Sequence, residues 1–276
     1  MQVKKVAVIG MGIIGGSICG ALTKAGYEVH GADLDKFALA VALEKGYIAD
    51  VAEDFSSYDT VIIAVPPKAT MSLLDTVVFK DGALVSDICG VKGCIENLVR
   101  EKKRNYRYVG VHPMAGKETS GIGSASPMLF AHANLIITVC EETDETALAE
   151  VQRLWQEMGV GRIILCSADE HDKKIAITSQ LAHIVSNAYV KSPQVSRCEG
   201  FTGGSFQDMT RIAGVDEKIW TELYFANKEN VLGELEGLIN NLSAYRDALR
   251  EESREKMADC LKEGREIREK IKCRND

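Results

Sequence analysis

The stretch that decides the fold is Val3-Lys4-Lys5-Val6-Ala7-Val8-Ile9-Gly10-Met11-Gly12-Ile13-Ile14-Gly15. Its first seven residues form a short apolar run typical of a buried strand, and residues 14–25 have the apolar spacing of a helix. Glycines at these three places permit a tight turn, close approach of a pyrophosphate and close packing of helix on strand. The free N–H groups of the helix start also attract an anion. We therefore expect the turn to hold dinucleotide phosphates through Gly10, Gly12, Ile13, Ile14 and Gly15.

An acid stands where this kind of turn needs one. Asp33 follows the second predicted strand, residues 28–32, and lies 23 residues after Gly10. A carboxylate there accepts hydrogen bonds from the ribose hydroxyls and repels a 2′-phosphate, which favours NAD over NADP as cofactor. The alternative is that Asp33 caps the helix that begins near Lys36. Asp35 is better placed for that cap.

Strands and helices alternate through the first half of the chain. Further short apolar runs occupy residues 60–65, 83–86, 108–111, 135–139 and 162–166. Helical patterns occupy residues 36–45, 92–103 and 144–158. This alternation is typical of crossover units. It predicts an α/β fold whose N-terminal domain, residues 1–167, is a Rossmann-type, doubly wound, mostly parallel sheet.

The pattern changes after residue 167, where strand-like runs end. Residues 169–190 and 226–250 have helical spacing, and residues 251–272 are densely charged. We expect residues 168–276 to form an all-helical substrate and dimerisation domain. Its broad apolar face would be buried against a second copy, giving a homodimer, although packing onto the chain's own first domain is the alternative.

Composition excludes several classes of protein. The 276 residues are 46% hydrophobic and 26% charged, an ordinary globular balance. A net charge of -7 argues against nucleic-acid binding. The sequence contains no stretch of 18 apolar residues, so it predicts no membrane span. The eight cysteines include no C-x-x-C pair. We expect buried free thiols in the cytoplasm and no metal site.

Two further segments lie at predicted strand ends, where ligands bind in such folds. Val65 and Pro66 end the strand of residues 60–65, so they belong either beside the cofactor or to a plain strand terminator. His112 follows the apolar residues 109–111 and opens a loop. A neutral imidazole there accepts a hydroxyl proton near pH 7, unless it is only a satisfied loop histidine.

Polar residues recur on two of the later helical segments. Asp172, Ser179 and His183 share one stripe, which lines either an elongated pocket or merely a solvated helix face. If residues 203–213 are helical, Gln207 and Arg211 share a face. Asp208 lies three residues before Arg211, so this arginine either forks onto a substrate carboxylate or makes a surface ion pair.

Taken together, these motifs resemble the prephenate and arogenate dehydrogenases. The resembling segments occur in family order over nearly the whole chain: Gly10 to Gly15, Ser86-Asp87 with Val91-Lys92, His112-Pro113-Met114-Ala115-Gly116, Gln180 with His183, and Phe206 with Asp208-Met209-Thr210-Arg211-Ile212-Ala213. The most specific of them are His112 to Gly116 and Asp208 to Ala213.

The resemblance implies roles for individual residues. His112 matches the histidine that deprotonates the ring hydroxyl, and Arg211 matches the arginine that binds the ring carboxylate. His183 matches a histidine near the substrate side chain. The remaining implied residues are Asp172 orienting the arginine, Glu118 as a polar gate, Trp220 near the pocket, Ser179, Gln207 and Asp208 in the substrate site, and Asp87 with Val65 and Pro66 in the cofactor site.

The implied activity is NAD-dependent oxidative decarboxylation of a cyclohexadienol, either prephenate or arogenate, for tyrosine biosynthesis. Two positions depart from the family pattern: Gly90 replaces a usual Ser, and Gln207 replaces a usual Lys or Arg. Two rivals are a β-hydroxyacid dehydrogenase and a non-catalytic NAD sensor. A β-hydroxyacid dehydrogenase would need a catalytic lysine on the first helix after the sheet, and Lys173 and Lys174 lie off the stripe that carries His183. A non-catalytic NAD sensor would lack His112 or Arg211.

Overall fold

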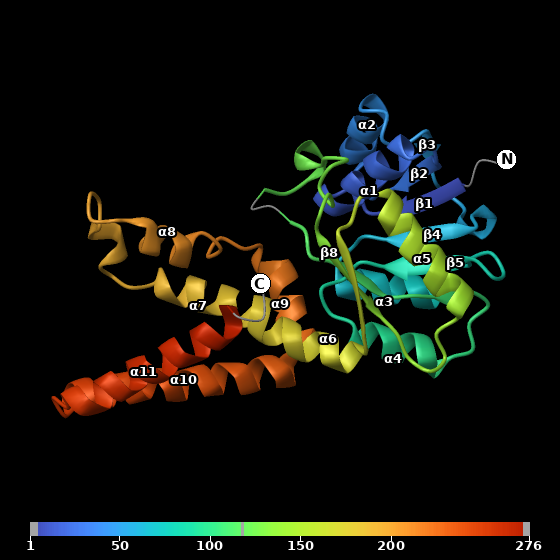
Figure 1. Ribbon diagram of the computed structural model, residues 1–276. Helices are drawn as coiled ribbons and strands as arrows, with labels where there is room; N and C mark the ends of the chain where they lie inside the picture. Colours follow the sequence, from blue (N-terminus) through green and yellow to red (C-terminus); the bar gives the residue numbers. More distant parts are fainter. Residues whose placement is uncertain (1–4, 117–118, 273–276) are drawn as a thin grey trace. The chain divides into compact units, whose positions relative to one another are not determined.

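The computed structural model describes residues 5–116 and 119–272 (Figure 1). The chain divides into two compact units, Met1–Lys228 and Glu229–Asp276. Strands give way to helices where the sequence predicts, since the last strand ends at Cys166 and the next helix begins at Ala168. The first compact unit nevertheless extends beyond this point. The predicted boundary between the cofactor domain, residues 1–167, and the substrate and dimerisation domain, residues 168–276, stays a prediction.

A six-stranded parallel sheet forms the centre of the first unit, in the order β3-β2-β1-β4-β5-β6. This order is that of a doubly wound Rossmann sheet, so the predicted fold class is confirmed. The chain reverses direction across the sheet between β1 and β4, and ligands bind outside the carboxyl ends of strands at such a switch point. The strands are β1 Lys5–Ile9, β2 Glu28–Ala32, β3 Asp50–Val51, β4 Thr60–Ile63, β5 Leu84–Asp87 and β6 Arg107–Tyr108.

Helices cover both faces of this sheet. Because successive strand residues point to opposite faces, Val6 packs in one core cluster with Ile18 of α1, and Ala7 packs in another with Leu74 of α3. Trp155 of α5 belongs to the first of these clusters. The helices are α1 Ile13–Lys24, α2 Lys36–Glu44, α3 Pro67–Thr76, α4 Gly93–Glu101 and α5 Glu145–Glu157.

Local chemistry explains where two of these helices begin. The Asp35 side chain accepts a hydrogen bond from the Phe37 N–H, so Asp35 caps α2 as predicted. Pro66 and Pro67 do more than end a strand. Pro67 is the first residue of α3, a position where the missing N–H costs nothing. The sequence pattern did not predict this helix, because the two prolines also indicate the end of a strand.

A second, three-stranded sheet has the order β7-β8-β9, with β7 Val111–Pro113 antiparallel to β8 Asn134–Thr138 and β8 parallel to β9 Arg162–Cys166. The single strand predicted for residues 108–111 is therefore wrong, because it divides between the two sheets. Gly110 lies at the division, where a Cβ would be 2.8 Å from Thr138 Oγ1 and 2.9 Å from Tyr108 Oη. His112 consequently lies within β7, opposite Ile136, and does not follow a strand.

The helix predicted over residues 169–190 is continuous but irregular. It consists of α6 Ala168–Ile175, a π-helical segment η3 Ala176–Gln180, and α7 Leu181–Tyr189. It is followed by α8 Gly204–Thr210 and α9 Glu217–Ala226. Ser186 Oγ donates to the Met209 carbonyl and Gln180 Nε2 donates to the Leu223 carbonyl. These bonds fix α8 and α9 against the long helix.

The second unit is a pair of helices, α10 Lys228–Arg250 and α11 Arg254–Lys272. Tyr245 Oη donates to the Cys260 carbonyl at 3.2 Å and joins them. Large apolar side chains remain exposed on both: Leu232, Ile239, Leu242, Leu249, Leu261 and Ile267. Among the described residues no helix is both long and apolar enough to cross a membrane.

Candidate active site

The glycine turn has the geometry that its sequence predicts. Gly10 has φ +101°, and a Cβ on it would lie 2.3 Å from the Ala64 carbonyl oxygen. A Cβ on Gly15 would lie 1.8 Å from the Gly10 carbonyl oxygen. Neither position tolerates a side chain, because both distances are far below contact distance. The turn after β1 and the end of β4 therefore meet directly at the switch point.

Gly12 is different, because a Cβ on it would meet no described atom within 4 Å. It is the N-cap of α1, and in the described part of the chain no side chain caps this helix and no acid lies in its first turn. The first N–H groups of α1, from Ile13, Ile14 and Gly15, need an external acceptor. This open cradle with a positive helix end fits the pyrophosphate of a dinucleotide.

Asp33 lies just beyond β2, half-buried, beside the glycine turn. Its carboxylate accepts hydrogen bonds from the Met11 N–H at 2.5 Å and the Asp35 N–H at 2.8 Å. Since each carboxylate oxygen carries two lone pairs, capacity remains for ribose hydroxyls. Asp33 thus also orders the glycine turn, a role that the sequence did not reveal.

Val65 and Pro66 lie at the same sheet edge, at the start of α3. A Cβ on Gly10 would lie 2.8 Å from Val65 Cγ1, which places this valine against the glycine turn. Pro66 is the N-cap of α3 and is exposed. Val65 therefore lies beside the glycine turn and Pro66 follows it at the start of α3, at the sheet edge where cofactor contacts are predicted.

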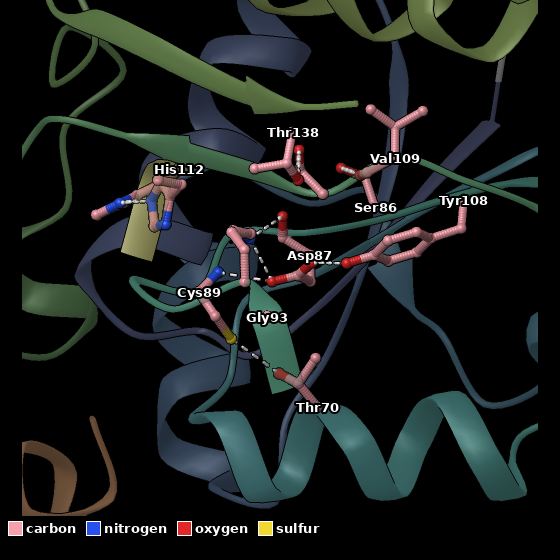
Figure 2. Close-up of polar contacts among 12 residues, drawn as sticks. Thr70, Ser86, Asp87, Cys89, Gly93, Tyr108, Val109, His112 and Thr138 are labelled. Atoms are coloured by element: carbon pink, nitrogen blue, oxygen red, sulfur yellow. Dashed lines mark hydrogen bonds and ion pairs between the residues drawn. The ribbon is translucent and has the colours of Figure 1, made fainter. Parts of the chain in front are cut away.

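Asp87, the last residue of β5, is fully buried. Its carboxylate accepts hydrogen bonds from Lys92 Nζ at 2.7 Å, from the Cys89 N–H at 2.8 Å and from Tyr108 Oη. Figure 2 shows this carboxylate between Cys89 and Tyr108. Three protein groups surround the Asp87 side chain, and it neutralises a buried lysine. The place of Asp87 in the cofactor site stays a prediction.

Lys92 and Asp87 form an ion pair with neither side chain exposed. Removing two charges from water is costly, and the attraction between them offsets this cost only while both partners are present. The sequence places Lys92 in the resembling segment, but nothing in its pattern indicates complete burial. Its positive charge lowers the pKa of two nearby histidines, His112 and His171.

His112 on β7 is half-buried, and its two ring nitrogens have different surroundings. Nδ1 lies 2.9 Å from Nε2 of His171. Nε2 and Cε1 each lie 3.6 Å from the point where a Cβ on Gly90 would be, and Leu223 Cδ2 lies 3.8 Å from that point. The space that a serine side chain would occupy at position 90 is therefore directly beside the free nitrogen.

His171 and Asp172, at the middle of α6, continue the chain of contacts. Nδ1 of His171 lies 2.7 Å from Asp172 Oδ1. Asp172 also accepts from the N–H groups of Lys92 at 2.9 Å and Gly93 at 2.8 Å, at the start of α4. Asp172 is buried against the start of α4, so the alternative of a solvated helix face is wrong for this residue, and a pocket shared with His183 stays a prediction. His171 was missed, because no motif marks it.

Burial lowers the pKa of His112 well below its ordinary value, and the neighbouring His171 and Lys92 lower it further. The pKa of His171 is also lowered, first by burial, while its hydrogen bond to Asp172 opposes this shift. Both imidazoles are therefore neutral near pH 7. A neutral imidazole with one free nitrogen is able to accept a proton from a substrate.

His183 on α7 stacks on Trp220 of α9, with ring centroids 3.9 Å apart. Its Nδ1 lies 2.9 Å from the Ser179 carbonyl oxygen, so Nδ1 donates there and Nε2 is left as an acceptor. The predicted proximity of Ser179 and His183 is real, but the contact uses the serine backbone. Trp220 supplies an aromatic wall beside His183.

The remaining predicted substrate residues lie around α8. Gln207 and Asp208 are exposed on this helix, and Arg211 follows as its exposed C-cap. The Arg211 N–H donates to the Gln207 carbonyl at 2.9 Å, so the expected helical spacing is correct. Glu118 lies outside the described residues.

A doubly wound sheet with an open phosphate turn, an acid after β2 and a neutral histidine beside the sheet defines a nucleotide-dependent oxidoreductase. Residues 18–165 match the family model of the prephenate dehydrogenase nucleotide-binding domain, and residues 167–263 match that of the prephenate dehydrogenase dimerization domain. The chain belongs to the prephenate dehydrogenase family, and the resemblance found in its sequence is confirmed.

Individual relatives agree with this assignment. A prephenate dehydrogenase from Bacillus subtilis is 28% identical over 98% of this chain and 76% of its own length. A cyclohexadienyl dehydrogenase from Zymomonas mobilis is 28% identical over 99% of this chain and 98% of its own. The crystal structure of prephenate dehydrogenase from A. aeolicus in complex with hydroxyphenyl propionate and NAD+ is 27% identical, with a TM-score of 0.85 over 98% of this chain and 99% of that one.

Proposed function

We propose that the protein converts prephenate to 4-hydroxyphenylpyruvate by NAD-dependent oxidative decarboxylation, a step of tyrosine biosynthesis. The observation that carries this proposal is the neutral His112, whose Nε2 lies beside Gly90 and takes no part in the contact with His171. The full-length similarity to prephenate dehydrogenases supports the choice of substrate. Arogenate is the alternative substrate.

The cofactor that we propose is NAD. The uncapped start of α1 would hold the pyrophosphate, and Asp33 would accept hydrogen bonds from the ribose hydroxyls while repelling a 2′-phosphate. Val65 and Pro66 would border the cofactor beside the turn. When bound, the nicotinamide supplies the hydride acceptor for the ring carbon that bears the hydroxyl group.

His112 would handle the proton in this reaction. Its Nε2 takes the proton of the ring hydroxyl as the carbonyl forms, and this breaks the O–H bond without leaving a charge on oxygen. Loss of carbon dioxide then moves the C–C electron pair into the ring, which becomes aromatic. The proton on His112 returns to the resulting phenolate oxygen, so the residue ends in its starting state.

The helical elements would bind the rest of the substrate. Arg211 would fork onto the ring carboxylate and orient it, without stabilising it so strongly that its loss becomes slow. His183, stacked on Trp220, would accept a hydrogen bond near the substrate side chain. Positioning of this kind contributes several kcal/mol to catalysis.

Ser179, Gln207 and Asp208 complete the proposed substrate site. Gln207 carries no charge where the family usually has a cation, so its position bears on the choice between the pyruvyl side chain of prephenate and the amino-acid side chain of arogenate. Glu118 is kept as a proposed polar gate.

We further propose that the protein acts as a homodimer in the cytoplasm. The match to a dimerization domain and the exposed apolar side chains of α10 and α11, including Ile239, Leu242 and Leu249, support the dimer. The seven described cysteines are all free, as expected in a reducing compartment.

The test is NADH formation by the purified protein with NAD and either prephenate or arogenate. Turnover of prephenate with the higher kcat/KM supports the proposal, and a higher value for arogenate replaces the substrate. The variant His112→Asn should lose this turnover. Its matched control is His132→Asn, because this exposed histidine has φ 64°, which Asn also adopts. Absence of turnover with both substrates, in protein that binds NAD, would contradict the proposed reaction.

A further inference from the structure

Three side chains form a continuous hydrogen-bonded network that runs from β7 through α6 to the start of α4. The network consists of His112, His171 and Asp172, with contacts of 2.9 Å between the two rings and 2.7 Å between His171 and the carboxylate. His171 and Asp172 are 1% and 5% exposed, so water does not compete for these bonds. Each ring nitrogen inside the network therefore has a fixed partner.

The chemistry of the three groups sets the direction of every bond. An ionised carboxylate only accepts, so Nδ1 of His171 carries a proton and donates it to Asp172. A neutral imidazole has one N–H, and Nε2 of His171 must therefore be an acceptor. Nδ1 of His112 consequently carries its proton and donates to His171. The lone pair of His112 is then on Nε2, beside Gly90.

Asp172 is held rigidly at the far end of this network. It accepts from the N–H groups of Lys92 and Gly93 at the start of α4, where the helix dipole favours a negative charge. Asn227 Nδ2 donates to the Asp172 backbone carbonyl at 2.7 Å and fixes the main chain as well. The carboxylate cannot turn away from His171 without losing two buried backbone bonds.

We propose that His171 and Asp172 are positioning residues that hold His112 in the tautomer with a proton on Nδ1 and a lone pair on Nε2. The proposal rests on the proposed function, in which His112 accepts the substrate hydroxyl proton. It adds that the acceptor nitrogen is selected before substrate binds, by residues that do not touch substrate. The wrong tautomer would present an N–H to the hydroxyl and could not take its proton.

Nearby charges keep this arrangement in place at neutral pH. The charged groups that act on the two rings are Asp87 at the end of β5, Lys92 at the N-cap of α4 and Asp172 on α6. Lys92 disfavours a positive charge on either histidine, and burial acts in the same direction. When Nε2 of His112 takes a proton, the new positive charge is stabilised through His171 by the carboxylate of Asp172.

The test compares His171→Leu, His171→Gln and Asp172→Asn with the control His132→Asn. The first readout is the nitrogen NMR spectrum of the histidine rings, which reports the tautomer of His112 directly. The others are kcat, KM for the substrate and the dissociation constant for NAD. Leu removes the acceptor, whereas the Gln side-chain oxygen can replace His171 Nε2. Asn at position 172 can keep its oxygen toward His171, where Oδ1 also accepts from the Lys92 N–H, but it then sets an N–H₂ group against the Gly93 N–H and removes the negative charge.

We expect the protonated Nδ1 form of His112 in the wild type and in His171→Gln, and mixed forms in His171→Leu. We expect mixed forms in Asp172→Asn as well, because the carboxylate that selects the tautomer has lost its charge and one of its backbone bonds. In general-base catalysis this should lower kcat by about tenfold or more for Leu and for Asn, while NAD affinity changes less than about threefold. Recovery of kcat by Gln distinguishes positioning from a merely structural role.

Two results would overturn the proposal: a wild-type His112 that carries its proton on Nε2, or variants that alter the tautomer and leave kcat unchanged. The wild-type spectrum decides the matter even if the leucine variant fails to fold. Failure of the proposed function is separate, because a protein that turns over neither prephenate nor arogenate still yields the ring spectrum.

Discussion

Nδ1 of His112 lies 2.9 Å from Nε2 of His171, and this contact leaves the other nitrogen of His112 to face a substrate. The two residues belong to β7 and α6, and no sequence pattern indicates that these two elements are in contact. Orientation of a base by a buried partner recurs in enzymes, because a ring held in one orientation and one tautomer does not populate unproductive states.

Replacing His112 by Asn should remove the proton acceptor and leave the cofactor site intact. We expect kcat to fall by about a hundredfold to ten-thousandfold, the usual contribution of a general base. NAD affinity should stay within about twofold, because the phosphate turn is formed by other residues. Steady-state NADH formation and a fluorescence titration with NAD measure the two effects. Activity within tenfold of wild type would remove His112 from the role of base.

The glycines of the phosphate turn should respond differently to alanine. Gly12→Ala places its methyl in open space, so the free energy of unfolding should change by less than about 0.5 kcal/mol. NAD affinity should fall about tenfold or more, since the methyl occupies the phosphate cradle. Gly15→Ala forces a contact with the Gly10 carbonyl and should cost about 3 kcal/mol or more. Urea unfolding and NAD titration separate the two variants, and equal stability losses would contradict the geometry.

Asp33→Ser should raise KM for NAD and narrow the preference for NAD over NADP. The serine retains some hydrogen bonding but removes the charge that repels a 2′-phosphate. Asp35→Asn is the matched control, because it removes a neighbouring charge while keeping the α2 cap. The ratio of kcat/KM for the two cofactors is the measurement. An unchanged ratio in Asp33→Ser, or an equal change in the control, would argue against the ribose role.

Acid should destabilise the protein partly through the neutral histidines. The folded pKa of His112 is lowered, so between that value and the unfolded value of about 6.5 the unfolded state binds more protons. Its stabilising contribution is therefore present above about pH 6.5 and is lost as the pH falls. Urea unfolding between about pH 7.5 and 5 should show a shallower loss for His112→Asn than for His132→Asn. Identical slopes would contradict the lowered pKa.

Lys92→Met should strand the Asp87 carboxylate in the interior. Breaking a buried pair on one side costs about 3–5 kcal/mol, because the remaining charge has lost its partner. The double variant with Asp87→Asn should recover part of this loss. Lys80→Met is the control, since its pair with Asp59 is exposed and contributes less than about 1 kcal/mol. Chemical unfolding of the four proteins is the measurement, and a cost for Lys92→Met as small as that of the control would refute the argument.

Much of the fold was readable from local pattern. The strand of residues 5–9, the glycine turn and the helix after it follow from apolar periodicity and from the steric needs of glycine. The alternation of strands and helices predicts the parallel sheet, since crossover connections leave few other arrangements. Errors arose where a local signal was ambiguous, as at Pro67, which begins a helix, and at Gly110, where one apolar run serves two sheets.

The chemistry of the site was divided in the same way. Residue type and position by themselves determined the candidate base His112, the acid Asp33 and the phosphate turn, because each lies in or next to an element whose pattern is local. Only the tertiary structure decided that His171 contacts His112, that Lys92 and Asp87 pair without solvent, and that Asp172 accepts hydrogen bonds from the start of α4. The physical reason is that periodicity tells which face of an element is buried, whereas the partner on that face comes from a distant part of the chain and is selected by packing.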